Sequence, residues 1–302
     1  MMKLGLNTAI LADFSFEQVV DCASENGYKC IEVCCWPKGK ASRRYAGVTH
    51  IDIDDLDSEK VKYYKEYAQS KGIYISSLGY YPNALSDDEK EAEVAVTHIK
   101  KLIKAAKKFD LEMITTFIGK NKTKTVDENI VLMKEVWTPI LKLAEEEGIK
   151  VAIENCPMLY SVDEWPGGAN LASTPYVWEE MFAMSANVGL NYDPSHPYLL
   201  GIDIDYAIKK YADRIFHVHF KDIKIIQDSV NKYGKFSYPG LWHIPKLPGL
   251  GDIEFNKFVS SLNEIGYKGS ACVEMEDRAF EATIEDTLEG VKICSKYMQT
   301  MI

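Results

Sequence analysis

The stretches VAIENC at 151–156 and VGLNYD at 188–193 begin with apolar residues and turn polar only toward their carboxyl ends. Apolar runs of this length are typical of parallel strands that are buried on both faces. Between them, residues 175–185 have a helical pattern, and Thr174 followed by Pro175 fits an N-cap with proline at the first helical position. Together the three segments predict a βαβ unit in a parallel sheet.

The same alternation continues in both directions along the chain. The predicted strands are 3–7, 30–36, 74–81, 113–119, 150–156, 188–193, 215–221 and 270–275. The predicted helices are 15–26, 57–71, 86–109, 126–147, 175–185, 203–212, 252–265 and 280–299. No linker or shift in composition divides the 302 residues. The sequence therefore predicts an α/β fold in which residues 1–302 form a single (β/α)8 TIM barrel, an architecture that needs about 250 residues.

Local signals at the helix ends agree with this alternation. The pairs that fit a capping box are Ser15 with Gln18, Ser86 with Glu89, and Thr125 with Glu128. The glycines that fit a left-handed helix end are Gly27, Gly72, Gly148 and Gly266. In PGLGDI, Gly249 and Gly251 predict a tight turn, and Asp252 is a predicted N-cap of the next helix.

Composition excludes several classes of protein. The chain has 35 Lys and Arg against 45 Asp and Glu, which gives a formal net charge of −10. This balance offers no global positive field, so we expect neither nucleic acid nor membrane as a partner. No apolar run approaches the roughly 20 residues of a membrane span. The first ten residues predict a strand and not a secretory leader, which favours a cytoplasmic location.

The chain has an odd number of cysteines, and most of them fall in short apolar runs. They are Cys22, Cys30, Cys34, Cys35, Cys156, Cys272 and Cys294. This pattern predicts buried, reduced thiols and not a disulfide framework. The adjacent Cys34 and Cys35 lack a CxxC partner, so we interpret them as packing residues.

Titratable residues stand at the ends of four consecutive predicted strands. They are Glu154 in VAIENC, Asp193 in GLNYDPSH, His219 in FHVHFKD and Glu274 in ACVEMED. Side chains alternate between the faces of a strand, so the alternation can aim all four residues into the barrel mouth, where TIM-barrel chemistry takes place. Carboxylate and imidazole ligands suit Mn²⁺, Co²⁺, Mg²⁺ or Zn²⁺.

Each of these residues alone has a simpler interpretation, because a carboxylate at a strand end is commonly a helix cap or an ion-pair partner. Four on consecutive strands are harder to explain in that way. Without a cation, three buried carboxylates would repel one another at a cost of several kcal/mol. Glu276 and Asp277 stay open as alternatives to Glu274, should the last strand be shifted by two residues.

These motifs carry a resemblance that covers essentially the whole chain. The segments IEN, NYDPSH, HVHFKD, PGLGDI and VEMED occur in the order seen in the sugar phosphate isomerase/epimerase family of xylose isomerase-like barrels, which also includes endonuclease IV. The resemblance implies one divalent metal ion, with Mn²⁺ as the first expectation, on Glu154, Asp193, His219 and Glu274. The family's His-x-Lys-Asp pattern is matched by His219, Lys221 and Asp222.

Neighbouring histidines have more than one interpretation. His217 has the parity of His219 but lies one layer deeper, which favours a paired core histidine. His196 matches the histidine of the family's Asp-x-x-His pattern. Contact with substrate or proton transfer by His196 and a structural role in its loop both stay open.

The resemblance implies a chemistry. A divalent ion that binds a carbonyl oxygen and a neighbouring hydroxyl oxygen stabilises the enediolate formed by loss of the intervening C–H proton. We therefore expect a metal-dependent sugar isomerase or epimerase. In the family's ketose 3-epimerases the glutamates of strands five and eight form the acid/base pair, which implies that role for Glu154 and Glu274. An acidic residue expected six positions after Glu154 is replaced here by Tyr160.

Aromatic residues follow several predicted strands and suggest a site for a sugar ring or a flat aglycone. They are Trp36, Tyr45, Tyr80, Tyr81, Tyr160, Trp165 and Trp242. The predicted substrate-binding residues are Trp36, Asn155, Tyr160 and Lys221. Arg43 and Arg44 fit either a phosphate contact or, as we favour, a solvated pair.

Two segments, CCWPKGKASRRYAGVTH and IENCPMLYSVDEWPGG, resemble the catalytic subunits of C-glycoside deglycosidases. That resemblance implies an alternative activity, the cleavage of a 3-keto-glycoside by β-elimination beside a small β-sandwich partner subunit. A homo-oligomer is also typical of the family. A non-catalytic sugar-binding barrel is a minor alternative. A nuclease is not favoured, because strands two to four end in CCW, GYY and FIG, without the extra histidines of a three-metal site.

Overall fold

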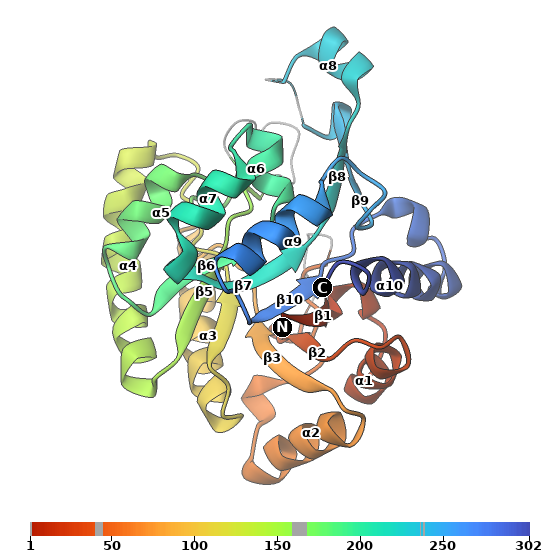
Figure 1. Cartoon of the computed structure of the whole chain (residues 1–302). Coiled ribbons are helices and arrows are strands. Elements are labelled where there is room, and N and C mark those ends of the chain that lie inside the picture. The colour runs from red at the N-terminus through yellow and green to blue at the C-terminus, as the bar shows by residue number, and fades with distance from the viewer. Residues whose placement is uncertain (1, 40–44, 159–167, 236, 238) are drawn as a thin grey trace.

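The chain forms a closed barrel of eight parallel strands, in the order β1-β10-β7-β6-β5-β4-β3-β2 (Figure 1). The computed structural model describes residues 2–39, 45–158, 168–235, 237 and 239–302. The barrel strands are β1 (Lys3–Asn7), β2 (Cys30–Cys34), β3 (Tyr74–Gly79), β4 (Met113–Thr116), β5 (Lys150–Glu154), β6 (Val188–Tyr192), β7 (Ile215–Phe220) and β10 (Ser270–Val273). Each lies within a range predicted from the sequence, so the TIM-barrel prediction is confirmed.

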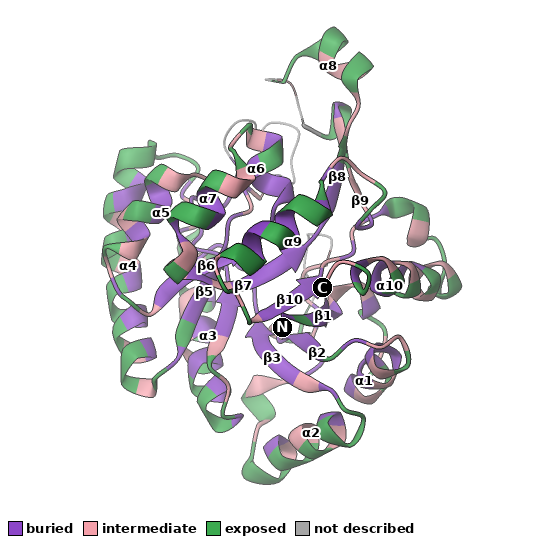
Figure 2. Ribbon diagram, in the orientation of Figure 1, coloured by how far each residue is buried: buried purple, intermediate pink, exposed green. Residues whose placement is uncertain are grey.

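Helices surround the barrel and bury one face each against it. The eight predicted helices are present as α1 (Phe16–Glu25), α2 (Ser58–Ser70), α3 (Glu89–Lys108), α4 (Val126–Glu147), α5 (Pro175–Phe182), α7 (Ile204–Lys210), α9 (Phe255–Glu264) and α10 (Ile284–Met298). Short 3-10 helices are η1 (Thr8–Leu11), η2 (Ile53–Asp55), η3 (Ala212–Arg214), η4 (Pro239–Leu241) and η5 (Arg278–Phe280). Figure 2 shows buried residues along the strands and exposed residues on the outer faces of the helices.

Most of the predicted helix ends are confirmed. Capping boxes join Ser15 to Gln18 and Thr125 to Glu128. The predicted box at Ser86 is wrong, because α3 begins at Glu89 and its N-cap is Asp88. The carboxylate of Asp88 accepts from two backbone N–H groups of the first turn, whereas the Ser86 hydroxyl accepts from the N–H group of Asp88 itself. The predicted left-handed glycines have φ values of 80°, 71°, 70° and 73° in chain order.

The core is apolar and its thiols are reduced. Trp137 and Trp178 are fully buried between helices and barrel. All seven cysteines are free, and only Cys156 is partly exposed, which confirms the prediction made from their positions. Within the described residues, no helix is both long and apolar enough to cross a membrane.

The structure also contains elements that the sequence analysis missed. They are the short helices α6 (Ser195–Leu200) and α8 (Gln227–Tyr233) and the antiparallel hairpin of β8 (Asp222–Ile225) and β9 (His243–Lys246). The hairpin and α8 extend away from the barrel (Figure 1).

Asp222 fixes the base of this hairpin to the PGLGDI loop. Its Oδ2 accepts hydrogen bonds from the backbone N–H groups of Gly249 and Gly251, each at 2.9 Å. Its Oδ1 accepts from the N–H groups of Ile223 at 2.8 Å and Ile253 at 3.0 Å. A Cβ at Gly251 would lie 2.3 Å from Asp222 Oδ1, so glycine is needed there for this close approach. The predicted turn is present, and the Asp222 carboxylate holds it in place.

The predicted N-cap at Asp252 is wrong. Helix α9 begins three residues later, at Phe255, and its N-cap is Glu254. The Asp252 carboxylate instead accepts from the N–H group of Ile225 at 2.7 Å. Asp252 therefore holds the hairpin against the loop, and the chain needs two more residues to reach the start of the helix.

We expect Asp222→Asn to lower the free energy of unfolding by about 1–3 kcal/mol. The amide nitrogen that replaces one carboxylate oxygen cannot accept the hydrogen bonds that this oxygen now accepts from backbone N–H groups. Denaturant unfolding followed by circular dichroism measures this. Asp228→Asn, on the exposed surface of α8, is the matched control and is expected to stay within about 0.5 kcal/mol of the wild type. Equal stability of the two variants would contradict the role given to Asp222.

Candidate metal centre

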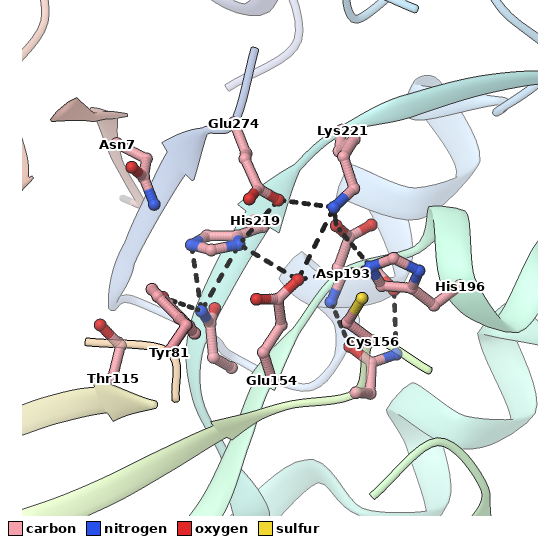
Figure 3. A network of polar contacts seen from close by, with 12 residues as sticks. Asn7, Tyr81, Thr115, Glu154, Cys156, Asp193, His196, His219, Lys221 and Glu274 are labelled. Atoms are coloured by element: carbon pink, nitrogen blue, oxygen red, sulfur yellow. Dashed lines mark hydrogen bonds and ion pairs between the residues drawn. The ribbon is translucent and has the colours of Figure 1, made fainter. Parts of the chain in front are cut away.

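Four predicted ligands come together at the carboxyl ends of adjacent strands. Glu154 is the last residue of β5, Asp193 directly follows β6, His219 lies in β7 and Glu274 directly follows β10. One ligand atom of each residue lies within 4.8 Å of those of the other three. Figure 3 shows the four side chains pointing toward a common centre. The convergence expected from the alternation of side chains along the strands is therefore present.

The backbone and side chain of Asp193 are held by two neighbours. Asn155 donates to the carbonyl oxygen of Asp193 at 3.0 Å and accepts from its N–H group at 2.8 Å, which joins the ends of β5 and β6. Ser195 donates to Asp193 Oδ1 through its N–H group at 2.8 Å and its hydroxyl at 2.6 Å. Asn155 thus positions Asp193, and its predicted contact with substrate stays a prediction.

The other oxygen of Asp193 points into the centre. Asp193 Oδ2 is buried and accepts no hydrogen bond from any described residue. Its close neighbours are cationic or titratable nitrogens, Lys221 Nζ at 3.0 Å and His196 Nε2 at 3.4 Å. A buried carboxylate oxygen that accepts no hydrogen bond keeps its lone pairs available, so it is well suited to a metal ion.

Lys221 lies among the carboxylates. Its Nζ is 2.7 Å from Glu274 Oε2, 3.0 Å from Asp193 Oδ2 and 3.7 Å from Glu154 Oε1. A fourth carboxylate, Glu276, is 3.8 Å away. Burial lowers the pKa of Lys221, but these carboxylates outweigh it and raise the pKa well above its usual value. The ammonium group therefore stays charged and compensates part of the negative charge at the centre.

His219 connects the centre to a carboxylate deeper in the barrel, which the sequence analysis missed. Its Nε2 is 2.7 Å from Oε2 of Glu32, a fully buried residue of β2. Burial raises the pKa of Glu32, but the charge and hydrogen bond of His219 outweigh it and bring the pKa to about 2. The only sequence signal for Glu32 is an acid inside the apolar run CIEVC.

The two predicted histidines lie around the four proposed ligands. His196 lies on α6, with Nε2 3.3 Å from Glu154 Oε1. His217 is fully buried and its Nδ1 is 2.9 Å from Asn191 Oδ1, which agrees with a paired core histidine. Burial lowers the pKa of His217 to about 4, so it is neutral.

An aromatic pocket of about 460 Å³ opens beside the centre. It is lined in part by Trp36, Tyr80, Tyr81 and Phe117. Trp36 packs edge-on against Tyr80, with ring centroids 4.8 Å apart. Tyr81 packs against Phe117 in the same way, and its ring is 6.3 Å from that of His219. The predicted residues that lie outside the described part of the chain are Tyr160, Trp165, Arg43 and Arg44.

The donor set at the centre fits a divalent cation. Three carboxylates and one imidazole are the ligand types of Mn²⁺, Co²⁺ and Zn²⁺ sites. Among the described residues, two smaller groups also offer three ligand atoms each. One of these groups is Glu32, His217 and His219. An ion bound there would have to break the hydrogen bond between His219 and Glu32 and the one between His217 and Asn191.

Comparison with known proteins agrees with the barrel fold. Residues 20–296 match the xylose isomerase-like TIM barrel family. The chain belongs to this family. Within it, the chain is 24% identical over 239 residues to an inosose dehydratase of Geobacillus thermodenitrificans, a match that covers 76% of this chain and 78% of the relative.

Solved structures share the fold at low sequence identity. The crystal structure of the IOLI protein with a bound zinc atom superposes with a TM-score of 0.72 at 19% identity, over 100% of this chain and 99% of that one. A D-psicose 3-epimerase from Clostridium cellulolyticum H10, solved with D-tagatose, superposes with a TM-score of 0.70 at 17% identity, over 99% of both chains.

We expect Lys221→Met to lower the free energy of unfolding of the metal-free protein by about 3 kcal/mol, because the buried carboxylates of Glu154 and Asp193 and the partly buried one of Glu274 lose their ammonium partner. Addition of Mn²⁺ should recover more stability in this variant than in the wild type. Urea unfolding with and without Mn²⁺ measures both. Lys209→Met, which removes an exposed ion pair with Glu264, is the control and is expected to change stability by less than about 1 kcal/mol.

Proposed function

We propose that the chain is a divalent-metal-dependent enzyme that removes a C–H proton next to the carbonyl group of a ketose or keto-sugar and acts as an isomerase or epimerase. The observation that carries this proposal is the convergence of Glu154, Asp193, His219 and Glu274 within 4.8 Å at the barrel mouth. Support also comes from the relatives, which include a zinc-containing barrel and an epimerase solved with a ketose.

The residues of the centre divide into ligands, acid/base groups and hydrogen-bond donors. When bound, a divalent cation would supply the positive charge that favours the enediolate over the neutral ketose. Glu154 and Glu274 come from strands on different sides of β7, so their carboxylates can accept and return a proton at two positions of one substrate. Lys221, with its ammonium group between them, is placed to donate hydrogen bonds to substrate oxygens.

A second candidate is β-elimination from the same enediolate. The observation that favours it is the pair of nitrogens beside Glu154, with His196 Nε2 at 3.3 Å and Lys221 Nζ at 3.7 Å. Elimination needs a proton donor for the departing group in addition to a base, and His196 can supply that proton while Lys221 donates a hydrogen bond. The dehydratase relative supports this candidate. The deglycosidase reaction with a partner subunit is a special case of it and stays a prediction.

We expect about one divalent ion per chain, with Mn²⁺ as the preferred ion, because four donors converge on one centre. Asp193→Asn should weaken binding at least 10-fold, since the oxygen that accepts no hydrogen bond loses its charge. Mass spectrometry of the metal content and titration calorimetry measure this. Glu276→Gln keeps the four proposed ligands and should leave the stoichiometry unchanged. Loss of the ion in Glu276→Gln but not in Glu274→Gln would show that the ligand set is wrong.

We expect the Mn²⁺-loaded protein to exchange solvent deuterium into a ketose or a keto-sugar, because proton removal precedes every outcome considered. Nuclear magnetic resonance of a panel of free ketoses, inososes and 3-keto-glycosides in D₂O measures exchange and product together. Glu154→Gln and Glu274→Gln should each lower exchange by 100-fold or more. A rearranged sugar supports isomerisation or epimerisation, and an unsaturated product supports elimination. Undiminished exchange in both variants would overturn the roles of these two glutamates.

A further inference from the structure

Glu32 is a buried carboxylate that the proposed reaction does not use. It lies in the middle of β2, with no exposed surface. Its Oε2 is 2.7 Å from His219 Nε2. Its Oε1 accepts hydrogen bonds from the hydroxyl groups of Thr115, at 2.7 Å, and Tyr81. The carboxylate is therefore held from both sides, with one oxygen left for the imidazole.

The backbone around Glu32 is shaped to admit this carboxylate. Gly79, on the neighbouring strand β3, has no side chain, and a Cβ there would lie 2.9 Å from Glu32 Oε1 and 3.2 Å from Thr115 Oγ1. A buried, charged carboxylate is costly unless all of its oxygens are paired. The missing side chain of Gly79 leaves space for the carboxylate of Glu32, and the two hydroxyl groups pair its Oε1 in this orientation.

The two nitrogens of His219 have different surroundings. Nε2 faces Glu32, whereas Nδ1 faces the metal centre, at 3.3 Å from Glu274 Oε2 and 3.8 Å from Glu154 Oε1. An ionised carboxylate only accepts hydrogen bonds, so Nε2 must carry a proton. The amide nitrogen of Asn191, 3.0 Å from Nε2, has a separate acceptor in the hydroxyl of Tyr81 at 3.2 Å. Nδ1 is consequently the nitrogen that can offer a lone pair to a metal ion.

We propose that Glu32 is a positioning residue for the metal centre. It holds His219 in the tautomer that is protonated on Nε2 and in the orientation that presents Nδ1 to the ion. This inference rests on the proposed metal-dependent function. In physical terms, Glu32 raises the basicity of the ligand nitrogen and removes the need to order the ring when the ion binds, an effect that outer carboxylates have on metal-bound histidines.

The decisive variant is Glu32→Gln, which has the same shape. Its amide oxygen can still accept from Tyr81 and Thr115, and its amide nitrogen then donates toward His219 Nε2. The ring proton must move to Nδ1, where it obstructs the ion. We expect the affinity for Mn²⁺ or Zn²⁺ to fall about 10- to 100-fold while the folded structure is retained. Titration calorimetry measures the affinity, and circular dichroism measures the fold.

Nitrogen-15 spectra of histidine-labelled protein separate positioning from a merely structural role. We expect a protonated Nε2 on His219 in the wild type, both metal-free and zinc-loaded, and an unprotonated Nε2 in Glu32→Gln. Thr115→Val is the matched control, because it removes a hydrogen bond from the other oxygen of the same carboxylate and leaves the contact with His219 intact. It should keep the Nε2 proton and lose less affinity than Glu32→Gln.

Each outcome decides the proposal. Wild-type affinity in Glu32→Gln, or a protonated Nε2 in that variant, would overturn it. If the wild type binds no divalent ion, the proposed function fails. The spectra of the metal-free protein still test the role of Glu32, because absence of the Nε2 proton in the wild type overturns the inference. If Glu32→Gln does not fold, Glu32→Asp replaces it. That variant keeps the charge with a side chain one methylene shorter, and should keep the Nε2 proton but bind the ion more weakly than the wild type.

Discussion

Repulsion among Glu154, Asp193 and Glu274 is the constraint on which the barrel mouth depends. These carboxylates are brought together by adjacent strands and are largely shielded from water, so the fold must supply positive charge at the same point. Lys221 supplies one charge, and its Nζ contacts all three. A divalent ion would supply more positive charge, and the Asp193 oxygen that accepts no hydrogen bond would be one of its ligands. The lysine and such an ion would therefore compensate the same negative charge.

The positions of these charges depend on uncharged neighbours and on the backbone. Asn155 bonds to both backbone groups of Asp193, and Ser195 occupies its other oxygen, so one oxygen alone faces the centre. On the far side of Lys221, Asp222 gathers four backbone N–H groups of the hairpin and the PGLGDI loop. Lys221 thus lies between strand β7 and a hairpin whose base is held by the Asp222 carboxylate.

The sequence was sufficient for the barrel because its strands and helices repeat regularly and each carries its own local signal. The convergence of four side chains was predictable too, since alternation along parallel strands fixes the face on which each residue lies. Glu32 was missed because one acid within an apolar run has no local partner, and its partners Thr115 and His219 are distant in sequence. The hairpin after β7 was missed for the same reason: β8 pairs with β9 across a helix that interrupts the strand pattern.

The proposed ligands and the aromatic pocket belong to neighbouring arcs of the barrel, and Tyr81 joins them. The proposed ligands come from β5, β6, β7 and β10, whereas the pocket residues Trp36, Tyr80 and Phe117 follow β2, β3 and β4. Tyr81 lines the pocket, and its hydroxyl donates to Glu32, which in turn contacts His219. A substrate group that displaced the Tyr81 ring would remove a hydrogen bond from Glu32. Tyr81 thus connects the aromatic pocket to the Glu32–His219 pair through contacts between buried side chains.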